Sequence, residues 1–314
     1  MKLGFIIPDY PNERRVALLP KDMFEFENEL VLETGFGATM DIPDREYEAK
    51  GCRIASRNDI FRECDSIFSL KLIQPSDYDR LRKGQMIIGW THPTGSGIRF
   101  METQAIPKEL VIVDMDNIYP TIYHQGNKIS IPFLRPNFIW KNSFMAGFSS
   151  TLHALMALGI LPDSNTKVAV LANGNVAQGA YTAITKFNCN TRLFYRKTME
   201  SFYETISDYD IIINGIEIDN DDEHIITKEQ LRKTKDRCLI LDAAADAGRA
   251  IEGTHYTTIK DPTYIEEGRY FYEVNNSPSI FFRETSRIIS EVFTQLVYKP
   301  DIERYWNLIK REEK

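Results

Sequence analysis

Four cationic or titratable side chains follow apolar runs in the first part of the chain, where the strands of a sheet would end. Arg14 and Arg15 lie in "NERRVALLP", Lys71 in "SLKLIQP" and His92 in "GWTHP". A guanidinium can bind both oxygens of a carboxylate, a lysine can polarise a carbonyl, and a histidine can exchange a proton near neutral pH. These residues predict a site for a small substrate that carries a carboxylate and a reactive carbonyl.

A second motif predicts a dinucleotide. Residues 168–180 read "VAVLANGNVAQGA", an apolar strand followed by small residues that open a helix. A Rossmann turn has three glycines, for the tight turn, for the approach of the pyrophosphate and for helix packing. If Gly174 is the second, Ala172 and Ala177 take the first and third places, and Asn175 and Val176 begin the helix. We predict that these five residues bind the cofactor, although a purely structural turn is the alternative.

The next strand predicts which dinucleotide binds. A carboxylate at its end would accept hydrogen bonds from the ribose 2′-hydroxyl of NAD, whereas a cation would pair with the extra phosphate of NADP. Here the strand ends in "YRK", so that Arg196 and Lys197 stand about 20 residues after Gly174, where the acid would be. NADP(H) is therefore the predicted cofactor, and a solvated pair of cations is the alternative.

The elements that must position these residues alternate between β-rich and helical runs. In the first half, "KLGFII", "ELVLETG", "SIFSLKL", "QMIIGWTH" and "LVIVDMD" read as strands, separated by helix-like stretches over 21–29, 58–64 and 75–83. After a helix predicted over 143–158, the alternation restarts with "KVAVLANG", "TRLFYRK", "DIIINGI" and "CLILDAAAD". The tail over 279–298 has helical periodicity and should return to the first half.

This pattern predicts an α/β protein of two Rossmann-like, doubly wound parallel-sheet domains separated by a cleft. Residues 1–130 and 280–314 would form the substrate (catalytic) domain, and residues 131–279 the NADP-binding domain. The 314 residues, 43% of them hydrophobic, suffice for two cores.

Composition excludes several other classes. A net charge of −7 argues against nucleic acid as the main partner. The four cysteines have no metal-ligand spacing, so no metal site is predicted. The sequence contains neither a membrane span nor a signal peptide, so we expect a cytoplasmic location. We also expect a homo-oligomer that acts on small molecules.

The substrate motifs resemble those of the alanine dehydrogenase and saccharopine dehydrogenase group. In alanine dehydrogenases, an arginine in R-V-A-L-x-P binds the substrate carboxylate, a lysine in V-K-x-x-x-P contacts substrate, and a histidine after the next strand assists proton transfer. The matching residues here are Arg15, Lys71 and His92. The segment "LDAAADAG" is similar to the family's V-D-x-x-x-D-Q-G-G, which places the catalytic-side aspartate at Asp246.

The resemblance implies further site residues and has clear departures. The segment "YEVNNSPS" resembles the family segment under the nicotinamide, which makes Asn275 and Asn276 candidates. Ala247 and Arg249 replace the glutamine and second glycine of D-Q-G-G, which puts the role of Asp246 in question. Arg249 is then either an added ligand for an amino-acid carboxylate or a surface cation.

Over nearly the whole chain, the resemblance is to a compact member of the group and implies a reductive condensation. Pyruvate and the side-chain amine of ornithine, or of lysine, would form an imine that NADPH reduces. Arg15 would hold the pyruvate carboxylate, Lys71 would stabilise the developing carbinolamine oxygen, and His92 would shuttle protons. The alternatives are an alanine dehydrogenase-like oxidative deaminase and a non-catalytic NADP-binding redox sensor.

Overall fold

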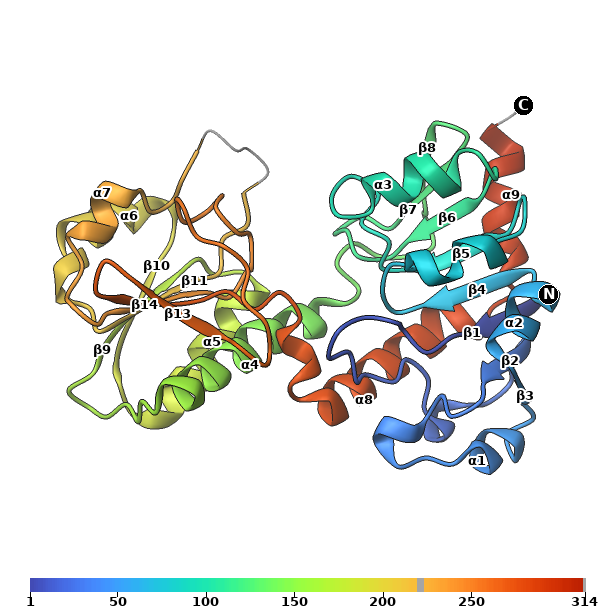
Figure 1. Cartoon of the computed structure of the whole chain (residues 1–314), viewed down its shortest axis with the longest axis horizontal. Coiled ribbons are helices and arrows are strands. Elements are labelled where there is room, and N and C mark those ends of the chain that lie inside the picture. Colours follow the sequence, from blue (N-terminus) through green and yellow to red (C-terminus); the bar gives the residue numbers. More distant parts are fainter. Residues whose placement is uncertain (219–222, 313–314) are drawn as a thin grey trace. The chain divides into compact units, whose positions relative to one another are not determined.

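The computed structural model describes residues 1–218 and 223–312 and divides into two compact units (Figure 1). Unit 1 comprises Met1–Ile139 and Ser286–Lys314, and unit 2 comprises Trp140–Thr285. The sequence pattern predicts boundaries at 130/131 and 279/280, whereas the units meet at 139/140 and 285/286. The structure moves the first one because Ile131, Leu134, Phe138 and Ile139 are buried in the core of unit 1. Residues 313–314, at the end of the predicted first domain, lie outside the described residues.

Unit 1 is built on an eight-stranded sheet of order β3-β2-β1-β4-β5-β6-β7-β8. The pairs from β3 to β6 are parallel, and β7 and β8 add an antiparallel hairpin. The parallel part has the Rossmann order 3-2-1-4-5-6, so the carboxyl ends of these strands share one edge. The strands are β1 (Lys2–Phe5), β2 (Glu29–Glu33), β3 (Arg53–Ala55), β4 (Ser66–Ser69), β5 (Met86–Gly89), β6 (Val111–Asp114), β7 (Thr121–His124) and β8 (Asn127–Ser130).

Helices cover both faces of this sheet. On one face, α2 (Arg57–Glu63) and α3 (Ile98–Phe100) contribute Ile60, Phe61 and Phe100 to a buried cluster. On the other, residues of α8 (Phe282–Phe293) and α9 (Glu303–Glu312) join the larger cluster of unit 1. The tail therefore returns to the first half, as predicted, and Figure 1 shows α9 in red beside the sheet. The short helix α1 (Asp44–Glu48) precedes β3.

The predicted helical stretch over 21–29 is wrong. Only a 3-10 turn, Pro20–Asp22, forms there. The amide N–H of Glu27 donates to Lys299 O at 3.0 Å, and the Asn28 side chain donates to Tyr298 O and Pro300 O. These bonds tie the segment to the tail, and the Glu27 N–H is thereby not available for a helical hydrogen bond. The stretch over 75–83 is likewise a 3-10 helix, Pro75–Arg80, whereas α2 confirms the helix predicted over 58–64.

Unit 2 has a six-stranded sheet of order β10-β9-β11-β12-β14-β13, in which only the β13–β14 pair is antiparallel among the described strands. Its four predicted strands are confirmed. The elements are β9 (Lys167–Leu171), β10 (Asn190–Phe194), β11 (Ile211–Asn214), β12 (Leu239–Asp242), β13 (Thr263–Glu266), β14 (Arg269–Tyr272), α4 (Trp140–Leu158), α5 (Asn175–Ile184), α6 (Met199–Glu204) and α7 (Lys228–Arg232).

Glycines bring α4 and α5 into close contact. A Cβ on Gly147 would lie 1.8 Å from Val176 O, and one on Gly179 would lie 1.9 Å from Phe144 O. Because no side chain fits at either place, this helix pair is fixed at backbone distance. The helix that opens with the dinucleotide loop is thereby held against α4.

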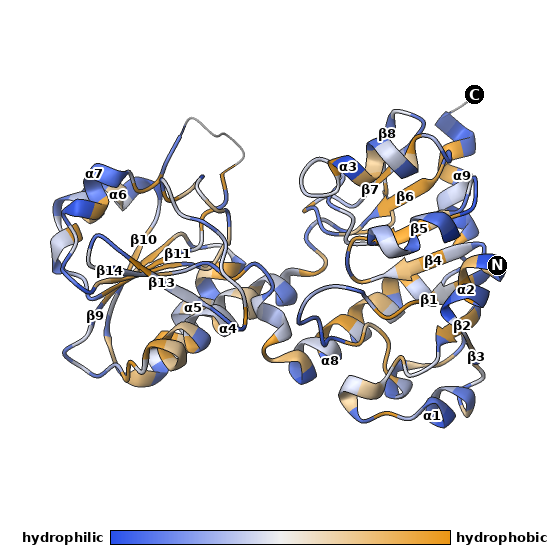
Figure 2. Ribbon diagram, in the orientation of Figure 1, coloured by the Kyte–Doolittle hydropathy of each residue, from blue (hydrophilic) through white to orange (hydrophobic). Residues whose placement is uncertain are grey.

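The hydrophobic residues lie mainly on the strands and the inner helix faces of each unit (Figure 2). Among the described residues, no helix combines the length and the apolar character that a membrane crossing requires.

Candidate active site

Arg15 lies in the loop after β1, and its guanidinium is fixed by Glu13. Arg15 Nε donates to Glu13 Oε1 at 2.8 Å and Nη2 donates to Oε2 at 2.5 Å. Burial opposes ionisation of Glu13, but the charges of Arg15 and Lys71 and the hydrogen bonds from Arg15 lower its pKa to about 2. The guanidinium carbon is 4.9 Å from the centre of the Trp90 ring. Glu13 and Trp90 therefore fix the plane of the Arg15 guanidinium, the group predicted to bind the substrate carboxylate.

Lys71, just beyond β4, shares the Trp90 ring with Arg15. Its Nζ lies 5.8 Å from the centre of that ring and 4.8 Å from the centre of the Tyr10 ring. Burial, followed by the charge of Arg15, lowers the pKa of Lys71 to about 8, although Glu13 acts in the opposite direction. A lysine with such a pKa can exchange a proton near neutral pH.

His92 follows β5, and its Nδ1 lies 2.9 Å from Asp116 Oδ2. Burial would lower the pKa of His92, but the hydrogen bond and charge of Asp116 outweigh burial and raise it. The charge of Lys71 lowers it, so the two predicted catalytic groups are electrostatically linked. With Nδ1 directed to Asp116, Nε2 is the nitrogen that can exchange a proton with substrate.

The local backbone brings these groups to the sheet edge. Gly89 has φ +148°, and a Cβ there would lie 1.8 Å from Ser69 O, so β4 and β5 approach closely just before Lys71 and His92. His92 has φ +46°, a strained value for a non-glycine residue, and its carbonyl accepts the N–H groups of Gly95 and Gly97. Such strain is typical of functional loops.

Four residues of this site were not predicted from the sequence: Glu13, Tyr10, Trp90 and Asp116. Asp116 could have been found, because Gly89 of β5 pairs with Asp114 of β6 in the sheet. The segments "GWTH" and "VDMD" therefore leave the sheet side by side, with His92 and Asp116 a few residues beyond. The positions of Glu13, Tyr10 and Trp90 depend on the conformation of loops, which the hydrophobic periodicity of the sequence does not predict.

In unit 2, the loop after β9 keeps the backbone of a glycine turn without its first glycine. Ala172 has φ +93°, a conformation that glycine adopts more readily. Gly174 has an ordinary φ of −73°, and a Cβ there would meet no atom within 4 Å. The protein's own packing therefore does not require glycine at 174, and close approach of a ligand is a sufficient reason for it.

The first turn of α5 presents the groups expected for a phosphate. The helix begins at Asn175, so the N–H groups of Asn175, Val176 and Ala177 have no partner within the helix. Ala177 is buried, and a Cβ on Gly215 would come 2.9 Å from the Ala177 Cβ. Only a small residue fits at position 177, as the third place of the motif requires.

Arg196 and Lys197 lie in a 3-10 turn, Arg196–Thr198, directly after β10. Both side chains are exposed, and neither forms an ion pair with a described residue. No carboxylate occupies the end of this strand, where Tyr195 precedes the two cations. This position can therefore offer positive charge to a ligand.

The remaining predicted residues follow β12 and β14. Asp246 is 9% exposed; its Oδ2 accepts the N–H of Ile218 at 2.9 Å, and its Oδ1 lies 3.7 Å from Nη1 of the half-exposed Arg249. Asn275 is exposed and Asn276 buried, at the start of the 3-10 helix Ser277–Ser279. These residues lie at the same sheet edge of unit 2 as the loop after β9.

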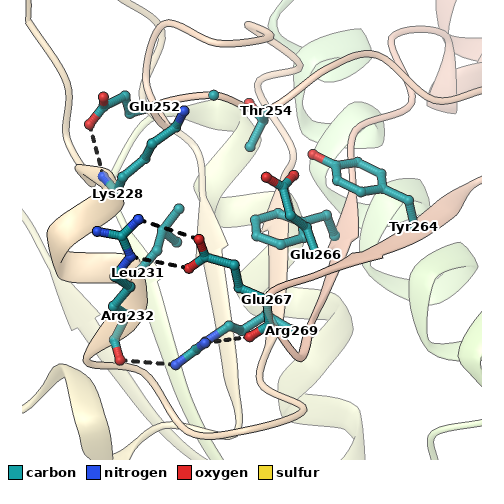
Figure 3. Close-up of a pocket in the computed structure, with 11 residues that line it drawn as sticks. Lys228, Leu231, Arg232, Glu252, Thr254, Tyr264, Glu266, Glu267 and Arg269 are labelled. Atoms are coloured by element: carbon teal, nitrogen blue, oxygen red, sulfur yellow. Dashed lines mark hydrogen bonds and ion pairs between the residues drawn. The ribbon is translucent and has the colours of Figure 1, made fainter.

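A different pocket of unit 2, about 90 Å³ in volume, lies away from these residues. Figure 3 shows that Arg232 pairs with Glu267 and that Arg269 donates to backbone carbonyls, so both guanidinium groups of this pocket already have partners. None of the predicted site residues lines it. The candidate site is therefore defined by the strand ends and not by this pocket.

Sequence and structure comparisons agree over the whole chain. The models of the alanine dehydrogenase/PNT N-terminal and C-terminal domains match residues 9–129 and 152–314. The chain is 55% identical to an N(5)-(carboxyethyl)ornithine synthase of Clostridium botulinum, covering 100% of this chain and 99% of that one. It is 48% identical to the synthase of Lactococcus lactis subsp. lactis, covering 99% of each.

Solved structures show the same fold. An L-alanine dehydrogenase superposes with a TM-score of 0.75 at 19% identity, covering 95% of this chain and 89% of that one. A transhydrogenase from Sinorhizobium meliloti gives the same TM-score and identity, covering 98% and 95%. Both domain models, the full-length relatives and the two sheets lead to one conclusion: the chain belongs to the alanine dehydrogenase/PNT family.

Proposed function

We propose that this protein catalyses the NADPH-dependent reductive condensation of pyruvate with the side-chain amine of ornithine, which gives N(5)-(carboxyethyl)ornithine. The observation that carries the proposal is the grouping of Arg15, Lys71 and the His92–Asp116 pair at one sheet edge of unit 1. The full-length similarity to N(5)-(carboxyethyl)ornithine synthases supports this choice among family reactions. Lysine is the second candidate amine.

In this proposal, each residue has one task before reduction. Arg15 binds the pyruvate carboxylate, in the plane that Glu13 and Trp90 hold. Lys71 stabilises the oxygen of the carbinolamine formed when the amine attacks the pyruvate carbonyl. His92 protonates that oxygen as water leaves, and so yields the imine. The pKa of His92 is raised and that of Lys71 lowered, so both can move protons near neutral pH.

The cofactor would be held by unit 2. Ala172, Gly174, Asn175, Val176 and Ala177 form a loop and helix start that fit a pyrophosphate, as the open space beside Gly174 indicates. NADPH, when bound, supplies the hydride that reduces the imine carbon. Arg196 and Lys197 would pair with its 2′-phosphate, and Asn275 and Asn276 would contact the nicotinamide side.

Asp246 and Arg249 are the remaining residues of unit 2 to which we give a role. We assign Arg249 to the carboxylate of ornithine and Asp246 to the nicotinamide side of the reaction. Arg249→Ala should raise the KM for ornithine about tenfold or more and leave that for pyruvate nearly unchanged. Initial rates with each substrate varied in turn measure this; a selective effect on pyruvate would reverse the roles of Arg15 and Arg249.

The deciding experiment is a substrate screen that follows NADPH absorbance. Purified protein receives pyruvate with ornithine, lysine or ammonium, each with NADPH and with NADH. We expect NADPH oxidation with ornithine or lysine and a product of the mass of the carboxyethyl amino acid. Oxidation with ammonium alone would indicate an alanine dehydrogenase-like enzyme, and NADPH binding without turnover on any pair would indicate a regulator.

We further propose that the enzyme works in the cytoplasm as a homo-oligomer. Analytical ultracentrifugation would test the oligomeric state.

A further inference from the structure

Three polar side chains are buried side by side at the carboxyl ends of neighbouring strands in unit 2. Asn214 ends β11, Asp242 ends β12, and Glu273 follows β14. The sheet pairs Asn214 with Asp242 and Leu241 with Tyr272, so Asp242 and Glu273 are the next neighbours. The three residues are 0%, 1% and 1% exposed. Two carboxyl groups therefore lie together out of contact with water.

Asp242 has the environment of a carboxylate. Its Oδ1 accepts hydrogen bonds from Asn214 Nδ2 at 3.0 Å and from the N–H groups of Ala244 and Ala245 at 3.1 and 3.2 Å. Its Oδ2 accepts the N–H of Asp246 at 3.3 Å. Ala245 has φ +55°, a left-handed conformation that this residue type rarely adopts. Asp242 therefore holds the strained turn that carries Asp246.

Glu273 has the environment of a neutral acid. Among the described residues, none donates a well-formed hydrogen bond to either of its carboxyl oxygens. The Thr254 hydroxyl is near, but it donates to Ile251 O at 3.0 Å. The Asp242 carboxyl is within hydrogen-bonding reach, and an acid can bond to it only if one of the two keeps a proton.

The donors decide which acid keeps the proton. Burial raises the pKa of both groups. At Asp242 the hydrogen bonds from Asn214 and the turn N–H groups limit the rise to about 6, whereas burial and the charge of Asp242 raise the pKa of Glu273 to about 8. The other titratable groups that act on the pair are Asp246, Tyr256 and Tyr264, and none is a cation. Within the described residues, no cation pairs with Asp242 or Glu273, and Arg249 lies against Asp246.

We propose that Glu273 stays protonated and donates a hydrogen bond to Asp242, and that this acid pair positions Asp246. Glu273 is thus a positioning residue, which acts through Asp242 and the turn 244–246. Loss of its proton would place a second negative charge beside Asp242 without a counterion and would disturb the turn. The role of the pair in turnover rests on the proposed function, whereas the shared proton does not.

The test replaces the acid by an amide that can donate but cannot ionise. In Glu273→Gln, the infrared difference spectrum against wild type at pH 7 should contain the C=O band of a buried, protonated carboxyl group. The Tm of the variant should match wild type near pH 4.5 and exceed it by about 5 °C or more at pH 8. As the pH rises, Glu273 of wild type ionises readily in the unfolded chain but not in the folded one, which favours unfolding. Glutamine cannot ionise in either state, so the variant has no such loss of stability. Glu266→Gln, in an exposed residue of β13 seen in Figure 3, is the matched control.

Turnover tests the positioning role separately. The ratio of kcat in Glu273→Gln to kcat in wild type should rise several-fold between about pH 7 and pH 9, since titration of Lys71 and His92 cancels in the ratio. Asp242→Asn should lower kcat tenfold or more at every pH, because it removes the anion that holds the turn. A flat ratio would overturn the positioning role. Absence of the protonated-carboxyl band together with a pH-independent Tm difference would overturn the shared proton, even if no substrate pair were turned over.

Discussion

At the scale of single residues, the charges at the edge of the first sheet set one another's protonation states. Asp116 raises the pKa of His92, while Arg15 contributes to lowering that of Lys71. His92 therefore keeps its proton to a higher pH than an ordinary histidine, and Lys71 releases its proton at a lower pH than an ordinary lysine. Both changes bring proton exchange closer to neutral pH, where a carbinolamine must lose water.

This arrangement predicts a pH effect for Asp116→Asn. The amide can still meet His92 Nδ1 but carries no charge, so the pKa of His92 should fall. Because the proposed step uses protonated His92, the alkaline limb of kcat should move to lower pH, as initial rates from about pH 6 to pH 9 would measure.

His92→Ala should lower kcat by ~10²–10⁴ with NADPH affinity nearly unchanged.

Asp79→Asn, in an exposed residue of the same unit, is the control for that series. An unshifted profile in Asp116→Asn would mean that the two side chains are not coupled during turnover. A loss smaller than about threefold in His92→Ala would make His92 structural.

Cofactor choice is also a matter of single residues. Arg196→Asp should raise the KM for NADPH roughly 10- to 150-fold, because a charge-assisted pair with the 2′-phosphate is lost and repulsion replaces it. The KM for NADH should change little, since NADH has no such phosphate. Lys186→Asp, an exposed position beyond α5, is the control. Equal effects of Arg196→Asp on both cofactors would refute the NADP assignment.

At the scale of elements, the loop between β9 and α5 separates stability from ligand binding. Gly174→Ala adds a methyl group where the protein has no neighbouring atom, and φ there is ordinary. The free energy of unfolding should therefore change by less than about 1 kcal/mol. The Kd for NADPH should rise about tenfold or more, because the methyl group occupies the path of the pyrophosphate. Calorimetric titration and urea unfolding measure the two quantities.

Gly147→Ala, in the contact of α4 with α5, should give the opposite result. Its Cβ would lie 1.8 Å from Val176 O, so the helices must separate and stability must fall. If Gly174→Ala instead destabilised the protein and left NADPH affinity unchanged, the loop would be a structural turn.

At the scale of the whole molecule, residues far apart in sequence complete one core. Tyr305 of α9 is fully buried in unit 1, and its ring lies 5.4 Å from that of Phe133. Tyr305→Ala should destabilise unit 1 by about 3–5 kcal/mol, as expected for a large-to-small change in a core. Tyr305→Phe should have a small effect, because it removes only a 3.3 Å hydrogen bond from Arg304.

Differential scanning calorimetry would show whether this loss is confined to unit 1. We expect the transition that contains unit 1 to move to lower temperature in Tyr305→Ala, while the unfolding of unit 2 is retained. An unchanged transition would mean that the tail does not contribute to the core that contains Tyr305.

The sequence by itself determined nine of the fourteen described strands, the two-sheet class, the return of the tail and the motifs that bear Arg15, Lys71, His92 and Gly174, whereas the short strands β3, β7, β8, β13 and β14 were not predicted. The predicted features depend on local patterns: apolar runs that are buried on both faces of a parallel sheet, and polar residues where such runs end. Only the tertiary structure decided that Glu13 clamps Arg15, that Asp116 pairs with His92, that Asp242 and Glu273 lie together, and that residues 21–29 form no helix. Each of these outcomes depends on the approach of loops, strand ends or a distant tail, and on the burial that follows, which no local pattern contains.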